Sequence, residues 1–166
     1  MIGREGLHRQ VLLDIVEAAG GRDARSYIST GNVSFDADPD GVADLVAIVE
    51  GEITGVVGRP TQVFVRRLTE LETMVSVDPF AEPPFEPVER IVAFFRDAVP
   101  GTFAIPTWSD RRDIAVIGSG RREIFCINRE VDGRVRGPGG WVERTGGQPV
   151  TTRAWGTITR IVDKLA

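Results

Sequence analysis

The 166-residue sequence is poor in the residue types that build covalent or metal-centred scaffolds. It has one cysteine, Cys126, and one histidine, His8, so it can form neither an internal disulfide nor a Cys/His metal cage. The aspartates in residues 36–44 lack the spacing of an EF-hand loop, and no GxGxxG or Walker A pattern occurs. Disulfide scaffolds and zinc fingers are therefore excluded, and we predict no cofactor and no metal.

The sequence also lacks a long hydrophobic run. No apolar stretch approaches the ~20 residues that a membrane-spanning helix needs, and residues 1–5 lack the core of a signal peptide. The unpaired thiol of Cys126 is ordinary in a reducing compartment. We therefore expect a cytoplasmic protein with no membrane partner.

Lysine is nearly absent, because Lys164 is the one lysine among 20 basic residues. The most direct cause is codon usage in a GC-rich genome, so abundant arginine is not itself evidence for phosphate binding. The net charge is −4, divided into −8 for residues 1–109 and +4 for residues 110–166. This asymmetry could steer an anionic ligand, or the two halves could simply attract each other.

Periodicity in the first half predicts the order helix, strand, strand, helix, strand. The expected elements are helices at 7–19 and 41–57 and strands at 24–29, 33–35 and 61–66. One strand added in front would complete a βαββαβ, ferredoxin-like arrangement. In that sheet the first strand is internal, so without it two neighbours would face unpaired backbone groups. We expect a strand from outside residues 1–166, or from a second copy in a homodimer, to fill that place.

A proline-rich segment separates the two halves. Residues 78–87 contain four prolines, which exclude a helix or a central strand. We therefore predict an N-terminal ferredoxin-like half at 1–77, a connector at 78–89 and a C-terminal α+β half at 90–166. Around and beyond the connector the expected elements are a short helix at 70–76, strands at 90–95, 113–118 and 123–128, a helical turn at 141–144 and a helix at 153–165. The nearly continuous apolar strand at 90–95 is typical of a strand covered on both faces.

Several segments resemble the DUF1697 family of bacterial proteins of unknown function. They are the helix at 7–20, Arg-Ser-Tyr-Ile-Ser-Thr-Gly-Asn-Val-Ser-Phe at 25–35, Asp-Pro-Phe at 78–80 and Thr-Thr-Arg-Ala-Trp-Gly-Thr-Ile-Thr at 151–159. The resemblance implies an α+β protein built from two ferredoxin-like halves, with no assigned activity. Family members usually begin with an apolar strand and a glycine-containing turn, of which residues 2–4 keep the turn alone. The first half thus lacks its N-terminal strand, and the glycine-rich residues 137–140 replace a segment that commonly carries lysine.

The first candidate site lies at the end of the chain. Thr151 or Thr152 could cap the last helix, and Arg153, Trp155 and Thr157 would cluster on its first turns. Free N–H groups, the helix dipole and a forked arginine donor attract anions, and Trp155 could offer a stacking surface. In the structural alternative, a threonine caps the helix, Trp155 packs into the core and Arg153 pairs with an acid of the other half.

The second candidate site is the polar turn formed by Ser29, Thr30, Gly31 and Asn32. Such a turn at a hairpin tip can present hydroxyl, amide and backbone N–H groups to a ligand. The alternative is turn chemistry alone, with glycine supplying a positive φ and asparagine bonding its own backbone.

Together these features favour a non-enzymatic cytoplasmic binding protein for a small anionic ligand or a protein partner. An alternative is a transferase or hydrolase acting on a phosphorylated or carboxylated small molecule. The lone His8, expected near a helix start, and Cys126, expected inside an apolar strand, are poor candidates for activated groups, which weighs against catalysis. A third alternative is an RNA-binding module, but the strands lack the basic and aromatic pattern of an RNA-recognition sheet, so the sequence disfavours nucleic acid.

Overall fold

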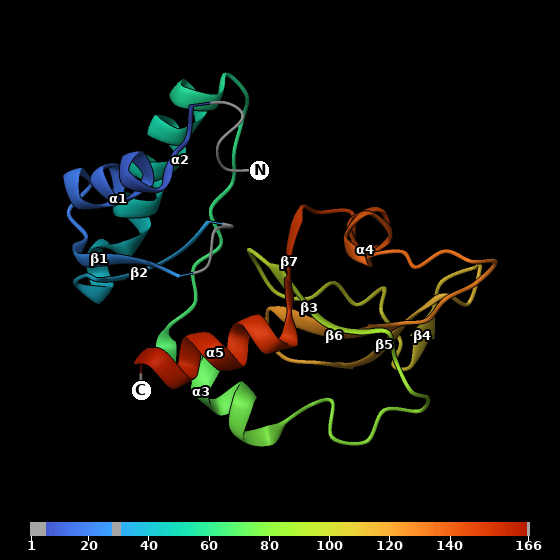
Figure 1. Cartoon of the computed structure of the whole chain (residues 1–166). Helices are drawn as coiled ribbons and strands as arrows, with labels where there is room; N and C mark the ends of the chain where they lie inside the picture. Colours follow the sequence, from blue (N-terminus) through green and yellow to red (C-terminus); the bar gives the residue numbers. More distant parts are fainter. Residues whose placement is uncertain (1–5, 28–30, 166) are drawn as a thin grey trace. The chain divides into compact units, whose positions relative to one another are not determined.

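The computed structural model describes residues 6–27 and 31–165 and divides the chain into two compact units, Met1–Val65 and Arg66–Ala166 (Figure 1). Helices accompany an antiparallel sheet in each unit, which confirms the predicted α+β class. The first unit ends at Val65, before the predicted boundary at residue 77, so the helix that follows belongs to the second unit.

The first unit consists of two helices and one hairpin. In chain order its elements are α1 (Arg9–Ala18), β1 (Arg22–Tyr27), β2 (Asn32–Asp36), the 3-10 turn η1 (Pro39–Gly41) and α2 (Val42–Val57). Asp38 accepts a hydrogen bond from the Asp40 N–H at the start of η1, and Gly58 ends α2 in the left-handed conformation. The predicted helices and hairpin of this half are thereby confirmed, with shifted ends.

Both helices of the first unit pack on one face of the hairpin (Figure 1). Leu12 and Val16 of α1 and Leu45, Val49 and Ile53 of α2 are buried there. Alternate strand residues complete this core, namely Ala24, Val33 and Phe35. Hydrophobic burial thus holds a two-strand sheet that would be only marginally stable by itself.

The predicted strand at 61–66 is wrong, because this segment has no ladder partner among the described residues. Val63 still packs against the helical core, as an alternating strand would. Two backbone N–H groups of this segment donate hydrogen bonds to side chains of α2 and not to a neighbouring strand. Val63 N–H donates to Glu50 Oε1 at 2.7 Å, and Thr61 N–H donates to Thr54 Oγ1 at 3.2 Å. The ferredoxin-like arrangement is therefore not confirmed for this unit.

The second unit is a five-strand antiparallel sheet with three helices. Its elements are α3 (Leu68–Val77), β3 (Glu89–Phe95), β4 (Thr107–Trp108), β5 (Ile114–Ser119), β6 (Glu123–Asn128), α4 (Gly139–Gly146), β7 (Val150–Ala154) and α5 (Trp155–Leu165). The strand order is β4-β5-β6-β3-β7, so β3 lies between β6 and β7. This chain order is not βαββαβ, and a ferredoxin-like second half is not confirmed either.

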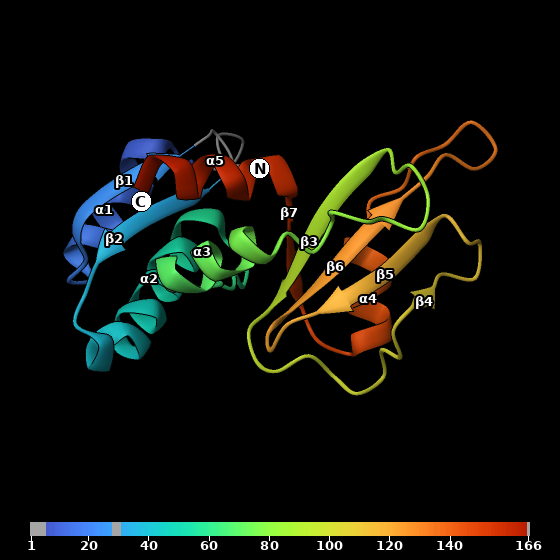
Figure 2. The same cartoon turned by 90° about the horizontal axis from the view of Figure 1, so that it is seen from below.

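Strand β3 divides the second unit into two cores. Ile91, Ala93 and Phe95 join a core that includes Val142 of α4, whereas Val92 and Phe94 point into the core beneath α3 and α5. Figure 1 and Figure 2 show α4 on one side of the sheet and the neighbouring helices α3 and α5 on the other. The prediction that this strand is covered on both faces is confirmed.

A buried amide connects the ends of two strands with a loop. The Asn128 side chain is fully buried, and its Oδ1 accepts a hydrogen bond from Glu89 N–H at 2.8 Å. Its Nδ2 donates to Glu89 Oε2 at 2.7 Å and to the Arg136 carbonyl at 2.9 Å. Because every polar atom of this amide has a partner, the network stabilises the start of β3 against the end of β6.

Replacing Asn128 with alanine should lower the free energy of unfolding of the second unit by about 2–4 kcal/mol, because it removes three hydrogen bonds of a buried side chain and leaves the Glu89 N–H and the Arg136 carbonyl without these partners. Urea titration followed by tryptophan fluorescence measures this unit alone, since Trp108, Trp141 and Trp155 all lie in it. Gln148→Ala, at a side chain with one hydrogen bond to the Ala98 carbonyl, is the control and should cost less than about 0.5 kcal/mol. Equal losses in the two variants would contradict the role of the amide network.

Candidate functional site

The predicted anion site falls on the junction between β7 and α5. Thr151, Thr152 and Arg153 pair with Phe94, Ala93 and Val92 of β3, and the helix begins only at Trp155. The prediction that Thr151 or Thr152 caps a helix starting at residue 153 is therefore wrong. Pairing with β3 keeps these residues in the sheet, where threonine is also a favoured residue.

Strand geometry separates the predicted residues between two faces of the sheet. Thr151 and Arg153 lie on one face, because alternate residues of a strand share a side and Arg153 Nη1 donates to Thr151 Oγ1 at 2.9 Å. Thr152 lies on the opposite face, where its methyl group approaches Gly139 at the start of α4. The structure thus brings Thr151 and Arg153 together and places Thr152 away from them.

Arg153 is a half-buried cation on the face that α3 and α5 cover. Besides Thr151 Oγ1, its Nη1 reaches the carbonyl of Thr152 at 2.8 Å. Burial lowers the pKa of Arg153 below its ordinary value, because the charged form has lost part of its hydration. An anion placed beside this guanidinium would offset that loss, and the arginine fork suits a phosphate or a carboxylate.

Trp155 and Thr157 begin α5 beside this arginine. The Trp155 ring packs into the core, with its centroid 5.2 Å from that of Phe80. Trp155 therefore has the packing role of the structural alternative. Thr157 is half-buried on the first turn of the helix, where the leading N–H groups have no partner within the helix.

A second arginine lies on the same sheet face, and the sequence analysis did not single it out. Arg66 is 6% exposed, and its guanidinium stands over the Phe94 ring, 5.0 Å from the centroid. The ring lies in a cross-strand row between Glu123 of β6 and Thr151 of β7. The sequence pattern gave no signal for a role of Arg66 on this sheet, because it predicted residue 66 as the last residue of a strand in the N-terminal half.

The contacts of Arg66 are those of a structural clamp. Its Nη2 donates to the carbonyl oxygens of Phe95 at 2.7 Å and Arg122 at 2.6 Å, and its Nε lies 3.6 Å from Glu123 Oε2. Burial and the charge of Arg122 lower the pKa of Arg66, although nearby carboxylates oppose this change. Arg66 thus fixes the chain before α3 to the ends of β3 and of the β5–β6 hairpin.

The second predicted site lies in the first unit, and only half of it is described. Gly31 has a φ of +77°, as the turn interpretation requires, and Asn32 Nδ2 donates to the Tyr27 carbonyl at 3.2 Å. Ser29 and Thr30 lie outside the described residues. The described geometry of Gly31 and Asn32 is that of turn chemistry, and a ligand role for this segment stays a prediction.

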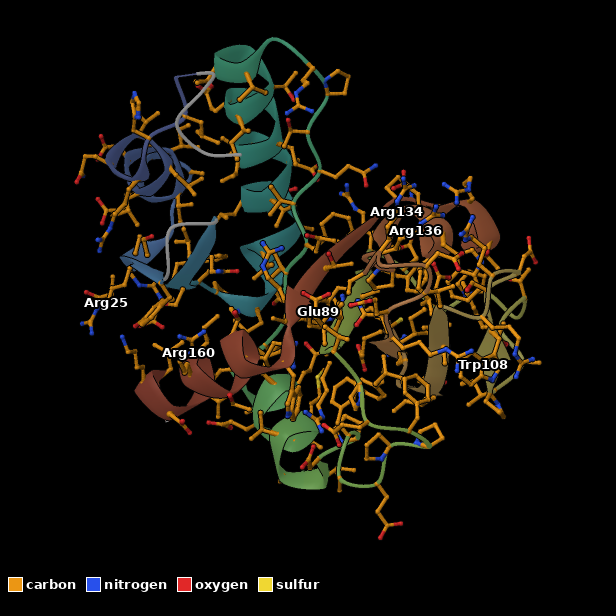
Figure 3. The ribbon with its side chains drawn as sticks, turned by 45° about the vertical axis from the view of Figure 1, so that its right-hand side comes forward. Arg25, Glu89, Trp108, Arg134, Arg136 and Arg160 are labelled. Carbon is orange, nitrogen blue, oxygen red and sulfur yellow. The ribbon has the colours of Figure 1, made fainter. Side chains whose placement is uncertain are left out.

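Trp108, labelled in Figure 3, belongs to a stack of aromatic and guanidinium groups on the second unit. Its ring stacks on Phe85 with centroids 5.5 Å apart, and the guanidinium carbons of Arg112 and Arg129 lie 4.9 and 5.4 Å from it. Arg129 also donates from Nε to the Arg112 carbonyl at 2.7 Å. Because these groups already contact one another, we interpret the stack as a cover for the short strand β4.

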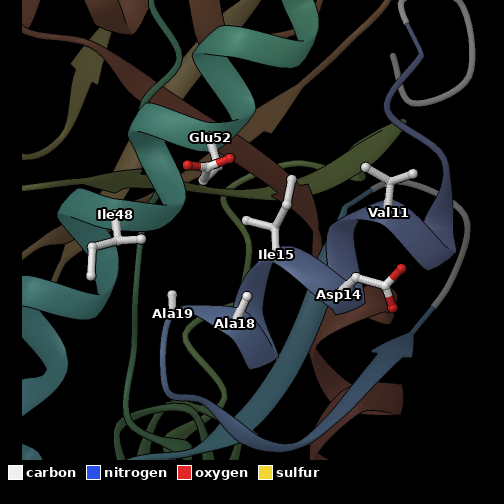
Figure 4. A pocket seen from close by; sticks show the side chains of 7 residues that line it. All are labelled: Val11, Asp14, Ile15, Ala18, Ala19, Ile48 and Glu52. Atoms are coloured by element: carbon white, nitrogen blue, oxygen red, sulfur yellow. The ribbon is translucent and has the colours of Figure 1, made fainter.

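Each unit has a hollow among its described residues. One of about 350 Å³ lies between α1 and α2 (Figure 4) and is lined by Val11, Asp14, Ile15, Ala18, Ala19, Ile48 and Glu52. The other, about 190 Å³, lies beside Glu70, Met74, Glu123 and Phe125.

Across residues 6–27 and 31–165, no group of three or more His, Cys, Asp and Glu side chains could hold a metal ion. Over the same residues, every helix is too short or too polar to cross a membrane.

Comparison with known families identifies the chain. A family model described as "Protein of unknown function (DUF1697)" matches residues 2–124, which include the whole described part of the first unit and the sheet as far as β6. The chain belongs to the DUF1697 family. No curated protein and no solved structure matches it. The DUF1697 match ends before β7, so Arg153 and its neighbours lie outside the residues that establish membership.

The thiol of Cys126 should be inert in the folded protein. Its side chain is fully buried on β6, and burial raises its pKa to about 12, so that roughly one thiol in ten thousand is ionised at pH 8. A chromogenic disulfide reagent at pH 8 should therefore react slowly, and urea should accelerate the reaction to the rate of a free thiol. Rapid reaction without denaturant would show that Cys126 is accessible and revive it as a nucleophile.

Proposed function

We propose that this DUF1697 protein binds a small anionic molecule, a phosphate or a carboxylate, at the junction of β7 and α5. One observation carries the proposal: Arg153, a partly dehydrated guanidinium, lies two residues before a helix whose first N–H groups have no partner in the helix. Arg153 would supply the fork, and Thr151 and Thr157 would supply hydroxyl groups.

The electrostatics of this junction favour a negative ligand. The α5 dipole places partial positive charge at Trp155, and Arg153 adds a full charge close by in the chain. An anion there would restore to the arginine the favourable interaction that burial removed, which raises its pKa towards the ordinary value. Binding at this junction requires no catalytic group, so the proposal is of a binding protein and not of an enzyme.

A thermal-denaturation panel tests the proposed site. Inorganic phosphate, sugar phosphates, nucleotides and carboxylates are added at increasing concentrations while tryptophan fluorescence follows the second unit. A ligand at a hundred times its dissociation constant should raise the midpoint of a unit of this size by roughly 10–15 °C. Arg153→Gln should abolish this increase, and Arg153→Lys should retain part of it because the charge remains without the fork.

The matched control is Arg160→Gln. Arg160 is exposed on the same helix, where its Nε donates to the Gly156 carbonyl at 2.7 Å (Figure 3). Its removal takes away one positive charge and this one hydrogen bond, and leaves Thr151, Arg153 and Thr157 in place. The control should keep the full stabilisation by the anion. Stabilisation that survives equally in Arg153→Gln would refute the site.

The catalytic and RNA-binding alternatives stay predictions from the sequence. Turnover of a generic phosphoester or acyl ester that is lost in Arg153→Gln would favour a hydrolase or transferase. Salt-sensitive retention on single-stranded RNA that is lost in Trp108→Ala would favour an RNA-binding module. A protein partner in place of a small anion would appear as binding that free anions do not compete with.

A further inference from the structure

The outer side of the helix pair α1 and α2 combines exposed apolar side chains with a hollow. Ile48 is 50% exposed, although it lies in the middle of α2. On α1, Val11, Ile15 and Ala18 follow one another at helical spacing and line the same hollow of about 350 Å³ (Figure 4). We call this hollow, with the seven lining residues named above, the α1–α2 groove.

The α1–α2 groove opens away from the hairpin. Leu12 and Val16 of α1 are buried in the core between the helices and the hairpin. Asp14 and Ala18 each lie two residues further along and are exposed, because two residues turn an α-helix by about 200°. The exposure of the groove therefore does not depend on the strands of this unit, which lie on the other side of the helices.

The groove carries negative charge on both of its sides. Asp14 lines it from α1 and Glu52 from α2, and both side chains are exposed. Asp14 accepts a hydrogen bond from the neutral Gln10 at 2.8 Å, and no ion pair among the described residues involves either carboxylate. Helix α2 has three acidic residues and no basic one. Charge complementarity therefore calls for a partner that is positively charged beside its apolar surface.

The charge of the whole first unit strengthens this preference. Residues 1–65 contain ten acidic and five basic side chains, a net charge of −5, whereas the whole chain has −4. A field of this sign attracts a cationic partner over about a Debye length. The same field opposes a second copy of this chain, because a symmetric pair would bring two acidic grooves against each other.

The walls of the groove select a helix as the occupant. Both walls are helices, whose backbone groups bond within the helix, so an extended peptide finds no strand edge to join. From Val11 to Ala19 the floor runs about 12 Å at 1.5 Å per residue, a little over two turns. A helix with apolar side chains at i, i+4 and i+7 covers this length.

We propose that the α1–α2 groove binds a basic amphipathic helix of a partner protein. The apolar stripe of that helix covers Ile48 and Ile15, and lysine or arginine on its flanks pairs with Asp14 on one side and Glu52 on the other. The small side chain of Ala18 leaves room for a larger one from the partner. This proposal does not depend on the anion site, because the groove belongs to the first unit and the anion site to the second.

Binding of labelled synthetic helices to the full chain tests the proposal. The probe is a leucine–lysine peptide of about 15 residues with leucine at i, i+4, i+7 and i+11, and fluorescence anisotropy measures its dissociation constant. One control peptide has the same composition in scrambled order, and another has glutamate in place of lysine. The periodic basic peptide should bind at least about tenfold more tightly than either control, because it alone has both the stripe and the matching charge.

Charge substitutions locate the bound peptide. The double variant Asp14→Asn with Glu52→Gln should weaken binding of the periodic basic peptide about three- to tenfold, because it removes both flanking carboxylates. Glu17→Gln is the matched control, since Glu17 is exposed on α1 but does not line the groove, and it should change the dissociation constant less than about twofold. In 1 M salt the difference between the variants should shrink.

Apolar substitutions provide an independent test. Ile48→Ala should weaken binding about five- to tenfold, because it removes exposed apolar surface that the peptide would cover. Val56→Ala is the control, since Val56 is 38% exposed on the same helix but does not line the groove. It should leave the dissociation constant within about twofold of the unmodified value. Circular dichroism of each variant shows whether its helices are retained.

Three outcomes would overturn the proposal. They are equal binding of the periodic and scrambled basic peptides, equal effects of Glu17→Gln and the double variant, and no binding of the periodic basic peptide up to about 1 mM. Decylamine, an apolar cation far smaller than a helix, is a further probe. Binding of decylamine without binding of the periodic basic peptide would assign the groove to a small amine and not to a helix.

Discussion

The second unit depends on the complete burial of strand β3. A strand covered by protein on both faces and between two neighbours can leave no backbone group unpaired, because water cannot reach it. Strand β6 meets this demand along one edge and β7 along the other. Successive side chains of β3 point to opposite faces of the sheet, and both faces are buried. Every second apolar residue therefore packs towards α4, and the residues between them pack towards α3 and α5.

This constraint also decides where the charged groups of that face lie. The centre of the face takes Val92, and the polar side chains Glu123, Thr151 and Arg153 occupy the flanking strands β6 and β7. Arg66 lies over the Phe94 ring and donates hydrogen bonds to two carbonyl oxygens. Cations in such a position cost desolvation energy, which short-range partners must offset. Arg66 bonds to two backbone carbonyl oxygens, whereas Arg153 bonds to one carbonyl and to the Thr151 hydroxyl. Each arginine lies two residues before a helix, Arg66 before α3 and Arg153 before α5.

Local pattern predicted those elements whose own residues determine them. The apolar run from Ile91 to Phe95 indicated a doubly covered strand, and glycine at residue 58 indicated the end of α2, as observed. Residues 61–66 have the alternation of a strand, but a strand exists only with a partner, and pairing is not encoded in the segment itself. Likewise Thr151 and Thr152 suit a helix cap and a strand equally well, and pairing with β3 decided between them. The candidate site shows the same division. Arg153 was proposed from its chemistry alone, whereas the separation of Thr152 from Thr151 follows from strand geometry.

The contacts of Arg66 bear on how the gene could be divided. All of its hydrogen-bond acceptors described above lie in β3 and the β5–β6 hairpin, and Met74 of α3 is buried against the same sheet. An expression fragment that starts at codon 66 would include α3, which covers this face of the sheet. A fragment that starts after α3 would expose the apolar side chains that α3 buries. The boundary at which recombination could exchange the first unit therefore lies before α3, between Val65 and Arg66, and not in the proline-rich segment that follows α3.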